Sequence, residues 1–148
     1  MSETARYWFH ILARSGEEAR LQHAARLAEK AWQEGDRVGI YCDDEQRAAT
    51  LDDLLWSWRP DAFLPHERIR GNDQRPTSPV AVIECEPSEK DWDTLIVLAS
   101  VLPASADRFA RLALIASNDE EILNQARQHF RQLRDLGVTP QVHDQRRR

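Results

Sequence analysis

The chain alternates short apolar runs with amphipathic stretches, and this alternation restricts its possible folds more than any other feature. Runs of strand length and composition occur at 6–13, 37–42, 79–84, 94–99 and 111–117. Between 17 and 32, apolar side chains return every three or four residues, which predicts a helix. Strands that alternate with helices at this spacing are typical of βαβ units. We therefore expect a three-layer α/β domain with a mainly parallel sheet and helices on both faces.

Two more helices and a long loop complete the predicted order. Asp43, with Gln46 three residues later, resembles a capping box and predicts a helix that runs to about Trp56. The following segment, 59–78, is rich in Pro, Asn, Asp and Gly, so we expect an extended surface loop.

The last helix is predicted to run to 136. Asn118 or Asp119 caps its start, and Gly137 closes it. A final strand is expected at 138–142.

Length and charge favour one soluble domain. The chain has 148 residues and a net charge of −5, and a chain of this length can bury an ordinary core. We expect one domain over 1–148, with 143–148 as a flexible polar tail.

The longest apolar runs, such as 95–102, are far shorter than the roughly 20 residues of a membrane span, and the first residues lack a signal-peptide core. These features predict a cytoplasmic protein without membrane contact.

The sequence predicts no metal and no cofactor. Cys42 and Cys85 lie in apolar runs, and neither has a Cys or His at zinc-site spacing. The five glycines form no phosphate-binding motif, and the first strand-to-helix turn pairs Gly16 with Glu17 and Glu18, whose charges would repel a pyrophosphate.

An enzymatic alternative depends on three acidic residues. Asp43, Asp44 and Glu45 follow a strand, where α/β sheets often bind ligands. They could form a metal-dependent or nucleotide-dependent site, or they could be the acidic first turn of a helix, which we favour. The five histidines lie in no recognisable catalytic motif.

The segment 54–66 concentrates large apolar side chains where the second helix ends. It contains five residues of interest: Trp56, Trp58, Pro60, Phe63 and Pro65. The prolines stop the helix. The aromatic groups must then either return to the core or contact a partner, for which Trp is well suited.

The last helix carries two stripes. The expected core stripe is Ile122, Ala126, His129, Leu133 and Leu136. The second stripe is Leu123, Arg127, Phe130, Arg131 and Arg134. An aromatic ring among guanidinium groups suits a peptide that ends in an aromatic residue with a free carboxylate. It could equally seat a nucleic-acid base, although the net charge disfavours direct DNA binding. The simpler interpretation is a solvated basic face with Phe130 in the core.

Three segments resemble the chi subunit of bacterial DNA polymerase III. They are LAEKAWQEGDRVGIYCDDEQRAATLDDLLWSWRPDAFLPH (27–66), DTLIVLASVLPASADRF (93–109) and ARQHFRQLRDLG (126–137). This resemblance implies a Rossmann-like fold without catalytic activity. It also implies an accessory role in DNA replication, in which chi pairs with the psi subunit of the clamp loader and binds the C-terminal tail of single-stranded-DNA-binding protein. That tail is acidic and ends in Pro-Phe.

Site residues follow from the resemblance position by position. The tail pocket falls on Arg127, Phe130 and Arg131, with Gly137 at the helix end and Arg134 as a further basic group. Leu123 stands where a family member has Lys, which weakens the expected basic character at that edge.

The same resemblance places the psi-facing surface on Trp56, Phe63 and Pro65. Trp58 and Pro60 extend it. Contact with DNA is expected only indirectly, through these partners.

Overall fold

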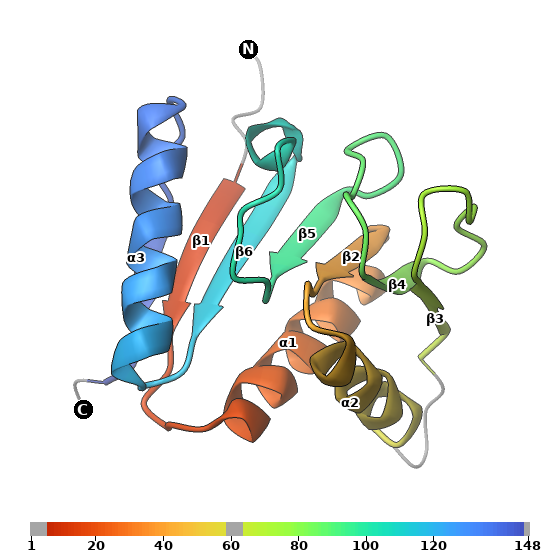
Figure 1. Ribbon diagram of the computed structural model, residues 1–148, viewed down its shortest axis with the longest axis horizontal. Helices are drawn as coiled ribbons and strands as arrows, with labels where there is room; N and C mark the ends of the chain where they lie inside the picture. The colour runs from red at the N-terminus through yellow and green to blue at the C-terminus, as the bar shows by residue number, and fades with distance from the viewer. Residues whose placement is uncertain (1–5, 59–63, 147–148) are drawn as a thin grey trace.

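A computed structural model describes residues 6–58 and 64–146. Within them the chain forms seven strands, three α-helices and a short 3-10 helix (Figure 1). The strands are β1 (Arg6–Ile11), β2 (Val38–Tyr41), β3 (His66–Ile69), β4 (Val80–Ile83), β5 (Thr94–Val97), β6 (Arg111–Ala116) and β7 (Gln141–Asp144). The helices are α1 (Glu17–Gln33), α2 (Glu45–Trp56), η1 (Ala106–Arg108) and α3 (Glu120–Asp135).

The strands form one sheet in the order β3-β4-β2-β5-β6-β1-β7. Every neighbouring pair is parallel. Helices α1 and α2 pack on one face, and α3 packs on the other against β1 and β6 (Figure 1). The predicted three-layer α/β fold is confirmed.

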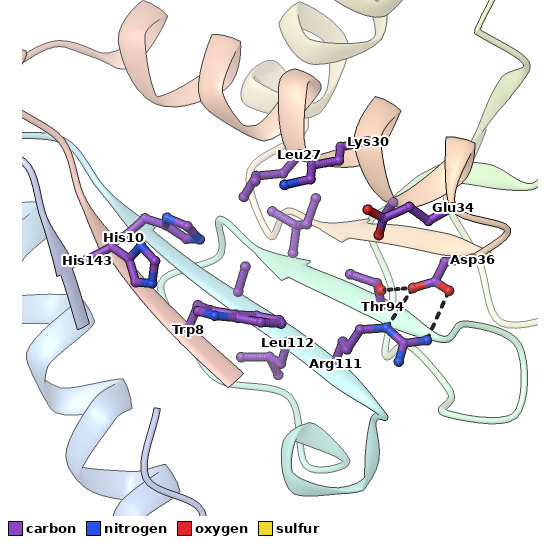
Figure 2. A pocket seen from close by; sticks show the side chains of 13 residues that line it. Trp8, His10, Leu27, Lys30, Glu34, Asp36, Thr94, Arg111, Leu112 and His143 are labelled. Carbon is purple, nitrogen blue, oxygen red and sulfur yellow. Dashed lines mark hydrogen bonds and ion pairs between the residues drawn. The ribbon is translucent and has the colours of Figure 1, made fainter. Parts of the chain in front are cut away.

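A half-buried ion pair joins the segment before β2 to the first residue of β6. The Asp36 carboxylate, between α1 and β2, accepts hydrogen bonds from Arg111 Nε at 2.7 Å and Arg111 Nη2 at 3.0 Å (Figure 2). It also accepts one from the Thr94 hydroxyl at 2.6 Å. Because Thr94 begins β5 and Arg111 begins β6, one carboxylate aligns the starts of both strands.

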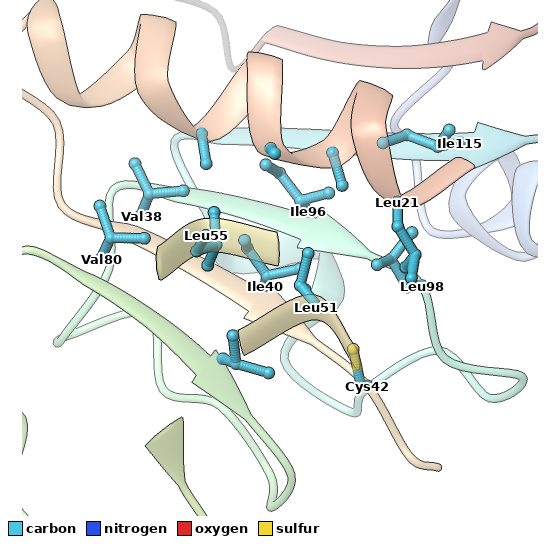
Figure 3. Packing of buried hydrophobic residues seen from close by; sticks show 14 of the residues in the cluster. Leu21, Val38, Ile40, Cys42, Leu51, Leu55, Val80, Ile96, Leu98 and Ile115 are labelled. Carbon is cyan, nitrogen blue, oxygen red and sulfur yellow. The ribbon is translucent and has the colours of Figure 1, made fainter. Parts of the chain in front are cut away.

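Each face of the sheet has its own apolar core. The core under α1 and α2 includes Leu21, Ile40, Leu51 and Ile96 (Figure 3). The core under α3 is built around Phe9, Leu95, Phe109, Leu112 and Leu133. Strands β4 and β5 are buried at every position, which explains why VAVI and TLIV are continuous apolar runs instead of alternating ones.

The predicted loop over 59–78 is wrong in part, because β3 forms within it. His66–Ile69 pairs in parallel with Val80–Ile83 of β4. Strand β3 lies at an edge of the sheet. Its first and last residues are buried, whereas its middle residues, Glu67 and Arg68, are half-buried. Charged residues are common on edge strands, so the sequence HERI lacks the apolar pattern by which strands are predicted.

The α2 cap lies one residue later than predicted. Asp44 Oδ1 accepts hydrogen bonds from the backbone N–H groups of Gln46 at 2.9 Å and Arg47 at 3.2 Å. Asp43 is instead bound to Ser100, whose N–H and hydroxyl donate to Asp43 Oδ2 at 3.1 and 2.5 Å. Asp43 therefore links the carboxyl ends of β2 and β5.

The final strand also forms later than predicted, at Gln141–Asp144 instead of 138–142. The α3 helix uses the earlier backbone for its own termination. The Val138 N–H donates to Leu133 O at 2.9 Å and the Gly137 N–H to Arg134 O at 3.0 Å, with Gly137 at φ 98°, as in a Schellman motif. Strand β7 therefore includes the first residues of the polar segment 143–148.

Candidate functional site

The α3 helix buries Leu123, Ala126, His129 and Leu133 against the sheet. This corrects two assignments. Leu136 was predicted to be in the core, but it is 54% exposed because the helix has already ended at Asp135. Leu123 was placed on the second stripe, but it is buried. A Leu at this position therefore contributes to packing.

Phe130 lies at the boundary between the core and the solvent. Its ring is half-buried and tilted 44° against the Phe9 ring of β1, with 6.1 Å between ring centres. Arg127 and Arg131, on either side of it along the helix, are exposed. The contact with β1 holds the aromatic ring in place while one side of it remains near the arginines.

The arginines of this stripe have few partners. Arg127 Nη1 lies 3.4 Å from Asn124 Oδ1, and Arg134 Nη2 lies 3.7 Å from Asp135 Oδ1. Both contacts are long. In the described part of the chain, no ion pair or side-chain hydrogen bond holds Arg131. The structure thus brings Arg127, Phe130, Arg131 and Arg134 onto one helix face that ends at the exposed Gly137.

Trp56 is the last residue of α2, and it is 60% exposed. Its ring centre lies 4.6 Å from that of His66, the first residue of β3. The His66 side chain is buried, with Nδ1 2.8 Å from Leu64 O and Nε2 3.3 Å from Asp52 Oδ1. A buried imidazole therefore packs against an exposed indole.

Trp58 has a different environment. It is half-buried against the α1/α2 core, and its Nε1–H donates to Glu29 Oε1 of α1 at 3.2 Å. Pro65 is also half-buried. Pro60 and Phe63 lie outside the described residues. Within the predicted psi-facing group, Trp56 is the residue that the structure places at the surface.

The two groups lie far apart on the sheet. Helix α3 contacts β1 and β6, whereas α2 contacts β3 and β4 at the other end of the strand order. The helices are also on opposite faces (Figure 1).

The three acidic residues of the enzymatic alternative do not converge. Asp43 binds Ser100, Asp44 caps α2, and Glu45 forms an ion pair with Arg70. Across 6–58 and 64–146, no three His, Cys, Asp or Glu side chains are grouped to hold a metal ion. Burial raises the pKa of the Cys42 thiol to about 12, as expected for a cysteine that serves as a small apolar group.

A histidine group was missed by the sequence reasoning. The His10 ring lies 5.0 Å from that of His23 and 5.3 Å from that of His143. Burial lowers the pKa of both His10 and His23 to about 4. The period-two alternation of β1 places Trp8 and His10 on one face of the sheet, but the contacts with His23 and His143 depend on the packing of α1 and on the pairing of β7 with β1.

Known proteins similar to this chain come from one family. The model of the family described as "DNA polymerase III chi subunit, HolC" matches residues 4–141. Among the described residues, no helix has the length and apolar character needed to cross a membrane.

Curated relatives cover most of the chain. It is 37% identical to DNA polymerase III subunit chi of Pseudomonas aeruginosa over 135 residues, which is 91% of this chain and 93% of the relative. It is 30% identical to the same subunit of Haemophilus influenzae over 146 residues, covering 93% and 94%. With that of Escherichia coli it shares 28% identity over 117 residues, covering 78% and 79%. The chain belongs to the DNA polymerase III chi subunit family.

Proposed function

We propose that this chain is a non-catalytic adaptor of the DNA polymerase III holoenzyme. In this role it links the clamp loader, through the psi subunit, to the C-terminal tail of single-stranded-DNA-binding protein. The observation that carries the proposal is the stripe of Arg127, Phe130, Arg131 and Arg134 on α3, in which a half-buried ring lies among exposed arginines whose guanidinium groups have only long contacts or none in the described residues.

The chemistry of this stripe matches an acidic tail that ends in Phe. The ligand's terminal ring packs beside Phe130, and its carboxylate accepts hydrogen bonds from Arg127 or Arg131. Guanidinium groups bind carboxylates in two-point geometry, and Arg134 attracts the acidic residues upstream. These arginines have no strong internal ion pairs. They can therefore bind a ligand without losing a stabilising interaction within the chain.

The psi subunit is assigned to the end of α2. Trp56 supplies a large exposed ring supported by His66, and Pro65 follows close by. Trp is enriched among the few residues that contribute most of the binding energy at protein interfaces. Trp58, Pro60 and Phe63 complete the proposed surface. DNA is reached only through the partners, because a net charge of −5 disfavours direct binding.

The adaptor role requires both partners to bind at once. We expect one complex of chain, psi and labelled tail peptide in size-exclusion chromatography, with the label co-migrating with psi only when the chain is present. A Trp56→Ala variant should lose psi but retain the peptide, and an Arg127→Ala variant should do the reverse. Competition between psi and the peptide for the chain would contradict the proposal.

A further inference from the structure

A hollow of about 230 Å³ lies beside α1, over the face of β5, β6, β1 and β7 (Figure 2). Helix α1 packs mainly on β2, β5 and β6, and the hollow lies between its Leu27–Glu34 side and strand β1. The hollow is remote from the stripe on α3 and from Trp56, neither of which lines it. Nothing in the adaptor role uses it.

Trp8 of β1 and helix α1 line opposite sides of the hollow, and we call the space between them the slot. Figure 2 shows the Trp8 ring on the sheet side, with Leu27 and Lys30 of α1 opposite. Ile96 and Ala113 complete an apolar lining. Trp8 is half-buried, so one side of its indole packs on the protein while the other borders the space. A planar ring between indole and helix would gain stacking and burial.

One end of the slot can accept a hydrogen bond. Asp36 is already engaged by Arg111 and Thr94. Glu34, on the same side in Figure 2, is exposed, and its carboxylate has no hydrogen bond or ion pair within the described residues. This carboxylate is the acceptor that remains for a donor on the ligand, such as an amino group.

The other end can bind an anion. Lys30 is exposed and its ammonium group is without an ion-pair partner in the described parts of the chain. It lies near enough to His10 for its charge to lower the His10 pKa. His143 of β7 is next to His10, with 5.3 Å between ring centres. The Lys30 ammonium group would attract a phosphate, and the neutral His10 ring and its neighbour His143 would donate N–H hydrogen bonds to it.

We propose that this hollow binds a nucleotide, with its base stacked on Trp8, its phosphate at Lys30, His10 and His143, and an amino group of the base bonded to Glu34. Aromatic stacking of a base combined with a cationic group near its phosphate is the means by which single-stranded nucleic acids are held without a glycine-rich loop. The site lies away from the Gly16 turn, so the missing phosphate motif there does not affect it. Adenine and cytosine carry the required amino group, whereas thymine does not.

Titration of the full chain with AMP, CMP and TMP tests this site, with ¹⁵N-labelled Trp indoles observed by NMR. The Trp8 indole resonance is assigned with the Trp8→Phe variant. We expect this resonance to shift when AMP or CMP is added, and we expect the chain to bind TMP more weakly than either. Adenosine without phosphate and ribose 5-phosphate without base should each bind worse than AMP. A short single-stranded oligonucleotide tests whether the nucleotide unit can come from DNA or must be free.

Matched variants separate the site from general effects. Trp8→Leu should raise the Kd for AMP at least about fivefold, in line with the loss of one stacking contact. Lys30→Gln should raise it by about threefold or more, as for a partly exposed charge pair, while Lys90→Gln, in the loop before β5 and outside the lining of the hollow, should leave it unchanged. Ala31→Phe should block the slot without removing any wall, so it remains informative if Trp8→Leu fails to fold.

Two results would overturn the proposal. One is the absence of any saturable shift of the Trp8 indole with AMP or CMP. The other is binding that persists unchanged in Ala31→Phe and Lys30→Gln.

Discussion

The Phe130 ring of α3 packs against the Phe9 ring of β1, with 6.1 Å between the ring centres. This contact gives one side chain two roles, in the core and at the proposed tail site. Phe130→Ala should lower the free energy of unfolding by about 1–3 kcal/mol, less than for a fully buried Phe because the ring is half-buried. Phe130→Leu should recover most of the stability but less of the peptide affinity. Urea unfolding measures the stability, and fluorescence anisotropy with a labelled peptide measures the affinity. Equal recovery of both would show that Phe130 serves packing alone.

Trp56 and Trp58 should respond oppositely to truncation. Trp56→Ala should cost about 2–4 kcal/mol of psi binding, as central aromatic hot spots do, with little change in the thermal midpoint, because the side chain is 60% exposed. Trp58→Ala should destabilise the free chain, since it removes core contacts and the hydrogen bond to Glu29. Calorimetry of unfolding and of psi binding distinguishes them. A large fall in stability for Trp56→Ala would place it in the core instead of the interface.

Gly39→Ala tests the packing of the central sheet. A Cβ atom at Gly39 would lie 2.6 Å from Ile83 Cδ1 and 3.2 Å from Trp92 Cγ. Because these atoms belong to the buried core under α3, the substitution should cost about 1–3 kcal/mol, as overpacking does. Chemical denaturation measures this cost, and the paired variant Gly39→Ala with Ile83→Val should recover part of it. A neutral effect of the single substitution would contradict the described contact.

Stability should fall in mild acid because of His10 and His23. Burial is the main cause that lowers both pKa values from 6.5 to about 4. The charges of His23, His143 and Lys30 add to the effect at His10, and Arg26 adds to it at His23. Between these pH values the unfolded chain binds more protons than the folded one, so the free energy of unfolding decreases as the pH falls from 6.5 towards 4.

Urea midpoints measured across this pH range test the expectation. The His23→Gln variant removes one titrating group, so its midpoint should depend less steeply on pH than that of the unmodified chain. Carboxylates titrate in both proteins, and their effect cancels in the comparison. Identical slopes would show that His23 is not held in the neutral form.

The parallel three-layer fold could be predicted from the sequence because β4, β5 and β6 are continuous apolar runs and α1 and α3 have clear apolar faces. Strand β3 could not, since HERI is defined by its pairing with Val80–Ile83 and not by its own composition. The cap of α2 depended on which of two adjacent aspartates faces the helix. That choice is set by Ser100, which lies 57 positions later in the chain and binds Asp43.

The α3 stripe was also predictable in part. Its arginines follow from helical spacing, but the contact between Phe130 and Phe9 requires the long-range packing of α3 on β1. The slot over Trp8 was not predicted, because it is lined by α1 and by four strands that are far apart in the sequence. Spacing along one segment contains no information on such a gap.

The most direct test of the adaptor account is the affinity of a labelled tail peptide of single-stranded-DNA-binding protein, measured by fluorescence anisotropy at several salt concentrations. We expect saturable binding that weakens with salt and disappears when the peptide's terminal Phe is deleted. Arg127→Ala and Arg131→Ala should each weaken binding and flatten its salt dependence, whereas Phe130→Ala should weaken it with little change in slope. If the Arg127→Ala and Phe130→Ala variants bind the peptide as tightly as the unmodified chain, the tail does not bind on α3.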